Sequence, residues 1–405
     1  MQTSLLGDVS NFYAGASLPA GETFEGQPGG YLLVRVSDMN LPGNERILGE
    51  SQRWSAKPGA KSATCPPGSV IFPKRGGAIG TNKKRLVERP CVLDPNVMAV
   101  EPLPGRLDSG YLYHWFKSFD LSSIANGSSV PQLNKKDLAP LRIPLPSIPV
   151  QRRIAQVLDR VDALRAKRGE AIALLDDLAQ SIFLDMFGDP VANPKSWERL
   201  PLGSVLDRID SGRSPVCLDR PAAKEEWGVL KLGAVTQCVY RPAENKALPE
   251  GAAKEIENEV RVGDLLFSRK NTSELVAAVA YVRNTRERLL IPDLIFRLVP
   301  KRGAQVDKAY LHGLLTYPSK REKVRSLASG SAASMPNISK AKLLSLECEL
   351  PPLVLQRQYA AKVNMLESAK SSHYAHLAEL DALTISLQHR AFCGELWPDE
   401  AAAVG

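Results

Sequence analysis

The 405-residue sequence has few of the side chains that metal or thiol chemistry requires, with six cysteines and five histidines. The cysteines are scattered without any C-x-x-C spacing, which predicts reduced thiols and neither a disulfide framework nor a zinc site. His373 and His376 fall on one face of an expected helix, but no cysteine or carboxylate completes a ligand set around them, so solvated helix positions are the better interpretation. We therefore expect no bound metal and no resident cofactor.

The sequence also lacks long apolar runs and export signals. No stretch approaches the roughly 18 apolar residues that a membrane span requires. Residues 1–8 have neither the basic start nor the apolar segment of a secretory signal. These absences predict a cytoplasmic protein with no membrane partner.

The motifs of common enzyme classes are missing as well. The sequence contains no G-x-S-x-G elbow, no H-E-x-x-H pair and no glycine-rich cofactor fingerprint at a strand-to-helix turn. Gly76–Gly80 is not a phosphate-binding Walker loop, because Lys83 follows Asn82 and not a glycine. Pro292-Asp293 resembles the start of a nuclease motif, but no Asp/Glu-x-Lys follows at a useful distance. These absences favour a binding protein over an enzyme.

What the sequence does contain is a long internal repeat. Leu145–Leu158 (LPSIPVQRRIAQVL) returns as Leu350–Val363 (LPPLVLQRQYAAKV), so that Gln356 follows Gln151 by 205 residues. Pro131–Lys135 returns as Pro336–Lys340 at the same shift, and earlier segments match at slightly different shifts. A repeat this long predicts two whole domains, since solenoid units have only about 20 to 50 residues.

The sequence pattern predicts that each half is a β-rich domain followed by a long helix. Short β-prone runs bounded by turn formers fill residues 1–146, and apolar residues then recur at seven-residue spacing from Val150 to the Gly188-Asp189-Pro190 stop. A second helix is expected from Leu355 to Ala391, each helix being a rod of roughly 55 Å. The matched stripes suggest an antiparallel helix pair, although the stripes of ordinary core helices look the same.

The predicted fold class is α+β, with two β-rich domains separated by two long antiparallel helices and related by a pseudo-twofold internal repeat. The predicted segments are a first domain (1–146), a central helical spacer (147–190), a second domain (191–349), a C-terminal helical spacer (350–396) and a tail (397–405).

A net charge of +8 and a pI near 9.1 indicate an acidic partner, with nucleic acid the first candidate. Basic and glycine-rich or hydroxyl-rich loops occur at matching places in the two halves, although a basic run is often only a solvated face. The candidate DNA-binding residues are Lys74, Arg75, Lys83, Lys84, Arg85, Asn126 and Ser128 in the first half, and Arg213, Arg269, Lys270, Asn271, Ser329 and Ser331 in the second.

The motifs that open both helices, with the C-terminal Leu387–Leu396 (LQHRAFCGEL), resemble those of the specificity subunits of type I restriction-modification systems. The loop Ser211–Pro215 and the run Gly263–Arg269 are similar to recurring target-recognition elements of that family. Two departures are visible: Arg357-Gln358-Tyr359 replaces the usual Arg-Arg-Ile in the second copy, and Ala14-Gly15-Ala16 lacks the usual Thr/Ser-Pro.

The resemblance implies a non-catalytic subunit whose two target-recognition domains read the two halves of a split double-stranded DNA sequence. It implies two modification subunits, which supply S-adenosylmethionine and methylate adenine, and restriction subunits that translocate and cut DNA. The helix residues implied in spacing and partner docking are Gln151, Arg152, Ile154, Val161, Gln356, Arg357, Leu366 and Leu380. A stand-alone architectural or regulatory DNA-binding protein remains the alternative, and a coiled-coil scaffold would leave the basic domains unexplained.

Overall fold

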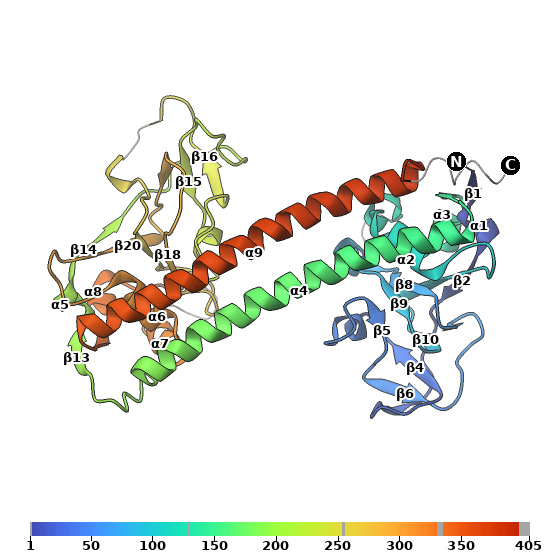
Figure 1. The fold of residues 1–405 in the computed structure, drawn as a ribbon, viewed down its shortest axis with the longest axis horizontal. Helices are drawn as coiled ribbons and strands as arrows, with labels where there is room; N and C mark the ends of the chain where they lie inside the picture. Colours follow the sequence, from blue (N-terminus) through green and yellow to red (C-terminus); the bar gives the residue numbers. More distant parts are fainter. Residues whose placement is uncertain (1, 128–129, 253–255, 330–334, 397–405) are drawn as a thin grey trace. The chain divides into compact units, whose positions relative to one another are not determined.

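A computed structural model describes residues 2–127, 130–252, 256–329 and 335–396. The chain divides into two compact units, Met1–Gly169 with Tyr374–Gly405, and Glu170–His373 (Figure 1). Each unit contains one β-rich domain and part of both long helices, α4 (Ile148–Phe187) and α9 (Leu353–Cys393). The finer division into domains and helical spacers stays a prediction.

The domain of the first unit contains two five-stranded sheets. One has the order β2-β11-β8-β9-β5, and the other, β3-β6-β4-β10-β7, includes the parallel pair β4 and β10. Its elements are β1 (Thr3–Leu5), α1 (Leu6–Val9), β2 (Ser10–Ala14), β3 (Glu22–Thr23), β4 (Tyr31–Val34), η1 (Val36–Asn40), β5 (Ile47–Leu48), β6 (Arg53–Ser55), β7 (Thr64–Cys65), β8 (Val70–Pro73), η2 (Gly76–Thr81), β9 (Arg85–Val87), β10 (Cys91–Leu93), β11 (Val97–Pro102), α2 (Ser109–Lys117), η3 (Leu121–Ile124), α3 (Lys135–Leu138) and β12 (Arg142–Pro144).

The domain of the second unit repeats this plan with shorter sheets. Its antiparallel sheet has the order β14-β20-β17-β18, and its second sheet, β16-β15-β19, also contains a parallel pair, β15 and β19. The elements are β13 (Glu198–Pro201), α5 (Leu202–Val205), β14 (Leu206–Ser211), β15 (Gly228–Leu230), η4 (Leu232–Ala234), β16 (Asn245–Ala247), η5 (Ile256–Asn258), β17 (Leu265–Ser268), β18 (Val279–Tyr281), β19 (Leu289–Leu290), β20 (Ile295–Pro300), α6 (Lys308–Thr316), α7 (Pro318–Arg325), α8 (Lys340–Leu344) and β21 (Glu347–Leu350).

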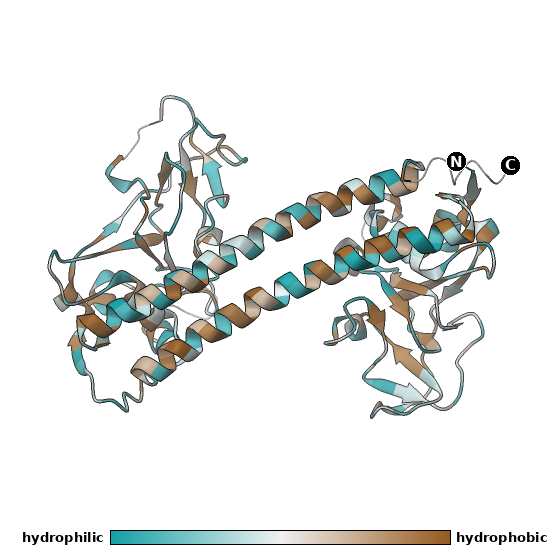
Figure 2. Cartoon of the chain, in the orientation of Figure 1, coloured by the Kyte–Doolittle hydropathy of each residue, from teal (hydrophilic) through white to brown (hydrophobic). Residues whose placement is uncertain are grey.

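The two long helices were predicted to within two residues at each end. Pro149 lies in the first turn of α4, where its missing N–H costs nothing, and Gly188 ends the helix at a φ of +77°. Both hydrophobic and hydrophilic residues occur along the length of both helices in Figure 2.

The helices pack against each other and against the domain within each unit. In the first unit, Ile154 and Leu158 of α4 share a core with Tyr111 of α2 and Ala391 of α9. In the second unit, the Phe183 ring of α4 lies 5.5 Å from the Tyr359 ring of α9, and a further contact joins Asp176 to Lys370 at 2.7 Å. Higher numbers on α4 thus meet lower numbers on α9, which confirms an antiparallel pair.

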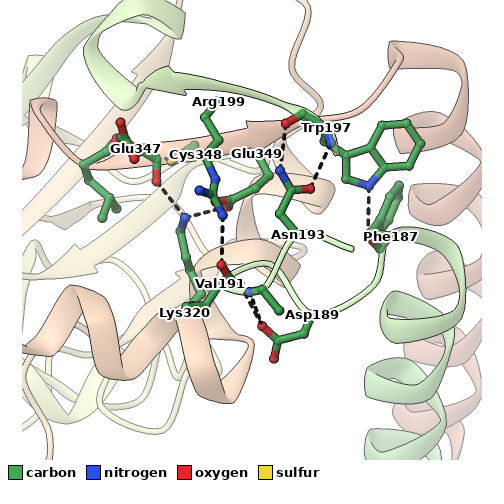
Figure 3. A network of polar contacts seen from close by, with 12 residues as sticks. Phe187, Asp189, Val191, Asn193, Trp197, Arg199, Lys320, Glu347, Cys348 and Glu349 are labelled. Atoms are coloured by element: carbon green, nitrogen blue, oxygen red, sulfur yellow. Dashed lines mark hydrogen bonds and ion pairs between the residues drawn. The ribbon is translucent and has the colours of Figure 1, made fainter. Parts of the chain in front are cut away.

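The exit of α4 is fastened to the second domain by capping bonds (Figure 3). The Trp197 indole donates to the Phe187 carbonyl at 2.9 Å, and Lys195 Nζ donates to the carbonyls of Asp185 (2.6 Å) and Met186 (3.0 Å). These bonds satisfy carbonyls that the last turn of a helix leaves without partners. The linker after α4 is therefore held against the helix end.

A buried ion pair continues this network into the sheet (Figure 3). Lys320 Nζ of α7 contacts Glu349 Oε2 at 2.5 Å and donates to the Glu347 carbonyl at 2.6 Å, and both side chains of the pair are almost fully buried. Arg199 of β13 lies 3.2 Å from the other Glu349 oxygen and donates to the Val191 carbonyl at 2.8 Å. One carboxylate thus joins α7, both strands of the β13–β21 pair and the linker.

Lys320→Met should destabilise the second unit by about 3–5 kcal/mol, because it leaves the Glu349 carboxylate buried without its nearest cation. Thermal and urea unfolding of the full chain measure this effect. Lys323→Met, on the same helix but exposed, is the matched control. Equal stability of the two variants would contradict the role assigned to the pair.

Candidate nucleic-acid interface

The candidate residues of the first half gather where β8 ends. The chain leaves β8 through Lys74, whose carbonyl accepts a bond from the Leu133 N–H at 2.9 Å. The Gly76 N–H donates to the Pro131 carbonyl at 2.8 Å, and Gln132 exchanges two backbone bonds with Asn126 (2.7 and 2.9 Å). The basic loop and the Asn126 loop therefore lie on either side of one segment, 131–133, which defines the basic edge of this unit.

The second half builds the same basic edge with equivalent bonds. The Ile338 N–H donates to the Arg269 carbonyl at 2.8 Å, and the Asn271 N–H donates to the Pro336 carbonyl at 3.4 Å. Asn337 exchanges two backbone bonds with Ser329, at 3.0 and 3.1 Å. The segment 336–338 is thus the counterpart of 131–133, so the repeat seen in the sequence is a repeat of main-chain hydrogen bonds.

Two glycines hold a third loop close to each basic edge. A Cβ on Gly15 would lie 1.8 Å from the Asp94 carbonyl oxygen, and a Cβ on Gly212 would lie 1.8 Å from the Ile291 carbonyl oxygen. Only glycine tolerates so close a backbone approach at these places. The second of these loops carries Arg213, and Ser214 Oγ beside it donates to the Asp293 carboxylate.

The side chains at the two edges differ in exposure. Arg75, Asn126, Arg213 and Ser329 are exposed, while Lys74, Arg269 and Lys270 are partly exposed. Lys83 and Arg85 are also partly exposed, but Lys83 bonds to the Asn40 side chain, and Arg85 bonds to the carbonyls of Met39 and Lys84. Burial, with a smaller effect of the neighbouring Arg75, lowers the pKa of Lys74, and Asp94 partly opposes this shift. Ser128 and Ser331 lie outside the described residues.

Lys84 and Asn271 are buried and lie away from solvent. Lys84 Nζ donates to the Phe119 carbonyl at 2.7 Å and to the Asn82 side chain, which sits in a left-handed turn with a φ of +52°. Asn271 Oδ1 accepts a bond from the Thr272 N–H at 2.9 Å. Both side chains make hydrogen bonds inside the domain, and neither belongs to the proposed interface.

Each basic edge also includes one lysine that was not among the predicted DNA-binding residues. Lys135 Nζ lies 5.6 Å from the centre of the Phe12 ring, and Lys340 Nζ lies 5.5 Å from that of Phe296. The Arg269 guanidinium also lies over Phe296, at 4.9 Å. The signal was available, because Lys135 and Lys340 end the matched segments at the 205-residue shift.

Comparisons with known proteins agree on one family. The type I restriction modification DNA specificity domain matches residues 1–174. The EcoEI specificity subunit of Escherichia coli is 32% identical over 209 residues, covering 48% of this chain and 34% of that protein. The EcoKI specificity subunit of E. coli strain K12 is 23% identical, covering 71% and 66%.

A solved structure extends the likeness to the fold. The S subunit of a type I restriction-modification system from M. genitalium superposes with a TM-score of 0.57 at 13% identity, over 96% of both chains. Residues 1–174 thus match the DNA specificity domain of type I restriction-modification systems, and the whole chain is similar in fold to a specificity subunit. The aligned regions span about one third and two thirds of the two curated relatives.

Two of the helix residues predicted to serve spacing and partner docking are buried within the chain's own fold. Gln151 and Gln356 have no exposed surface, and Ile154 and Val161 are nearly buried. Arg152 and Arg357 are exposed, and Leu366 and Leu380 are partly exposed. The two glutamines are therefore out of a partner's reach, whereas both arginines remain accessible.

In the part of the chain that the structure describes, no group of three metal-ligating side chains occurs. The same residues include no helix that is long and apolar enough to cross a membrane.

The pH dependence of stability provides a test for the burial of Lys84. Burial lowers its pKa from 10.5 to about 8. Between these values the unfolded chain keeps a proton that the folded chain has released, so stability should rise with pH across this window. Lys84→Met should remove that rise, measured as unfolding free energy against pH.

Lys83→Met is the control, because the neighbouring Lys83 is only partly buried. An unchanged pH slope in Lys84→Met would show that Lys84 is solvated after all.

Proposed function

We propose that the chain is the non-catalytic DNA-specificity subunit of a type I restriction-modification complex, acting on double-stranded DNA in the cytoplasm. Each basic edge binds one half of a bipartite target, and partner subunits methylate adenine or cut the DNA. The observation that carries this proposal is the repeat of one basic edge, with the same backbone bonds, in both units.

The side chains of the two edges suit DNA in two ways. Lys74, Lys135, Arg269 and Lys340 carry positive charge, which fits phosphate contacts. Exposed arginines such as Arg75 and Arg213 have the planar fork that can read guanine in the major groove. The two edges have the same pattern of backbone hydrogen bonds but different side chains. We therefore infer that each edge recognises a different DNA sequence.

The helices offer surface for partner subunits. Leu164, Leu174 and Leu178 of α4 are between 45% and 60% exposed, and Met365 and Ile385 of α9 are at least 70% exposed. Exposed apolar side chains mark interaction sites where they form a contiguous patch. We infer that two modification subunits and the restriction subunits assemble on this chain, and that it binds no cofactor itself.

Alanine substitutions separate phosphate contacts from base contacts. Arg269→Ala and Lys340→Ala should each weaken binding of the full chain to DNA. Loss of a phosphate contact lowers affinity for all sequences and reduces the salt slope by about 1, whereas loss of a base contact relaxes one half-site and costs about 1–3 kcal/mol.

Arg302→Ala is the matched control, since Arg302 is exposed in the same unit but follows the opposite end of β20. Affinity and specificity that match the control in both variants would remove the basic edge from the interface.

The function itself is tested by co-expression with the modification subunit and sequencing of modified adenines in host DNA. A methylated bipartite motif that disappears when the chain is deleted would establish the specificity role. A chain that binds DNA but neither forms a complex nor directs methylation would instead be a stand-alone DNA-binding protein.

A further inference from the structure

Each domain is tied to its long helix by one buried glutamine, and we call this contact the helix clamp. Gln151 Oε1 accepts a bond from the Asp108 N–H at 2.8 Å, and its Nε2 donates to the carbonyls of Pro146 (2.8 Å) and Arg106 (3.1 Å). The amide is fully buried and uses its acceptor and both donors.

The second unit repeats the helix clamp bond for bond. Gln356 Oε1 accepts from the Asp307 N–H at 2.8 Å, and its Nε2 donates to the carbonyls of Pro351 (2.7 Å) and Gln305 (3.0 Å). Asp108 and Asp307 are the N-caps of α2 and α6. Each clamp therefore fixes the start of a long helix to the start of a short helix in the domain core.

A second contact lies further along the helix, and we call it the lateral contact. In the first unit, Asp159 Oδ1 meets Arg46 at 2.5 Å and His114 Nε2 at 2.6 Å, and Asp162 meets Lys117 at 2.7 Å. These carboxylates follow Gln151 by 8 and 11 residues, or about 12 to 16 Å along the helix.

The second unit places its lateral contact at the same helical positions. Arg283 donates to Asn364 Oδ1 at 2.5 Å and lies 3.6 Å from Glu367. Its guanidinium covers the Tyr281 ring at 4.9 Å. Asn364 and Glu367 follow Asp159 and Asp162 by the same 205 residues. The lateral contact thus lies at equivalent helix positions in the two units, although different side chains form it.

The helix clamp and the shared hydrophobic core hold each domain on its helices, and the lateral contact adds directional polar bonds further along the helix. We propose that the lateral contacts are positioning contacts, which set the angle of each recognition domain on its helices and thereby the gap between half-sites that the chain accepts. This inference rests on the proposed function. It assigns Asp159, Asp162, Asn364 and Glu367 to selection of the gap, and not to reading of bases.

The lateral contact of the first unit should contribute more to gap selection. It contains the close ion pairs Arg46–Asp159 and Lys117–Asp162 and a hydrogen bond between the nearly buried His114 and Asp159, whereas Arg283 has one close neutral partner and one more distant carboxylate. Charged pairs at short range interact more strongly than pairs at longer range.

Selection from a randomised DNA duplex library with the purified full chain tests this inference. The recovered sequences give the two half-sites and the distribution of gaps between them. Asp159→Asn with Asp162→Asn should keep both half-sites and lower discrimination against a gap one base pair longer or shorter by about fivefold, the scale of one modest contact.

Glu170→Gln, an exposed acidic residue on α4, controls for the loss of charge. Gln151→Leu should broaden the gap distribution in the same way, with Gln156→Leu, exposed on the same helix, as its control. Thermal unfolding of each variant shows whether it is folded, and if Gln151→Leu does not fold, the aspartate variant carries the test.

An unchanged gap distribution in the folded aspartate variant would overturn the inference, as would a change in half-site bases together with the gap. If the unaltered chain recovers no bipartite motif, the proposed function fails, which is a different result from a bipartite motif whose gap is insensitive to the variants.

Discussion

A buried amide must satisfy all its hydrogen-bonding groups, and this constraint joins domain to helix twice in this chain. Gln151 and Gln356 each bond to the loop before a long helix and to the N-terminus of a short core helix. A substitution that removed one group would leave a buried partner unpaired, so both glutamines persist where neighbouring residues differ. Together with the shared hydrophobic core, this contact holds each domain on its helix.

The two units show which features of a duplicated domain are free to change. The backbone bonds of the basic edge are the same in both, but Lys74 and Arg75 stand where Arg269 and Lys270 stand in the other copy. Backbone bonds place a loop regardless of its side chains, so side-chain chemistry can vary without loss of the fold. Such a division suits a protein that recognises two different short sequences with one framework.

Periodicity and the repeat revealed the long helices, because spacing along one helix is a local property of the sequence. Burial of Lys84 was not visible, since its acceptor, the Phe119 carbonyl, is 35 residues away and only the folded domain brings them together. The identical register of the two glutamines predicts one shared role in spacing and partner docking. The structure gives both side chains internal bonds, which a sequence pattern cannot distinguish from bonds to a partner.

The units are not equivalent where the chain passes from α4 into the second domain. The buried Glu349 joins Lys320, Arg199 and the linker there, but the residue 205 positions earlier is Pro144, which has no carboxylate. A buried ion pair adds little net stability compared with apolar packing, yet its geometry admits few alternatives. The main role of this ion pair is therefore to position the linker after α4, which the helix clamp does not contact.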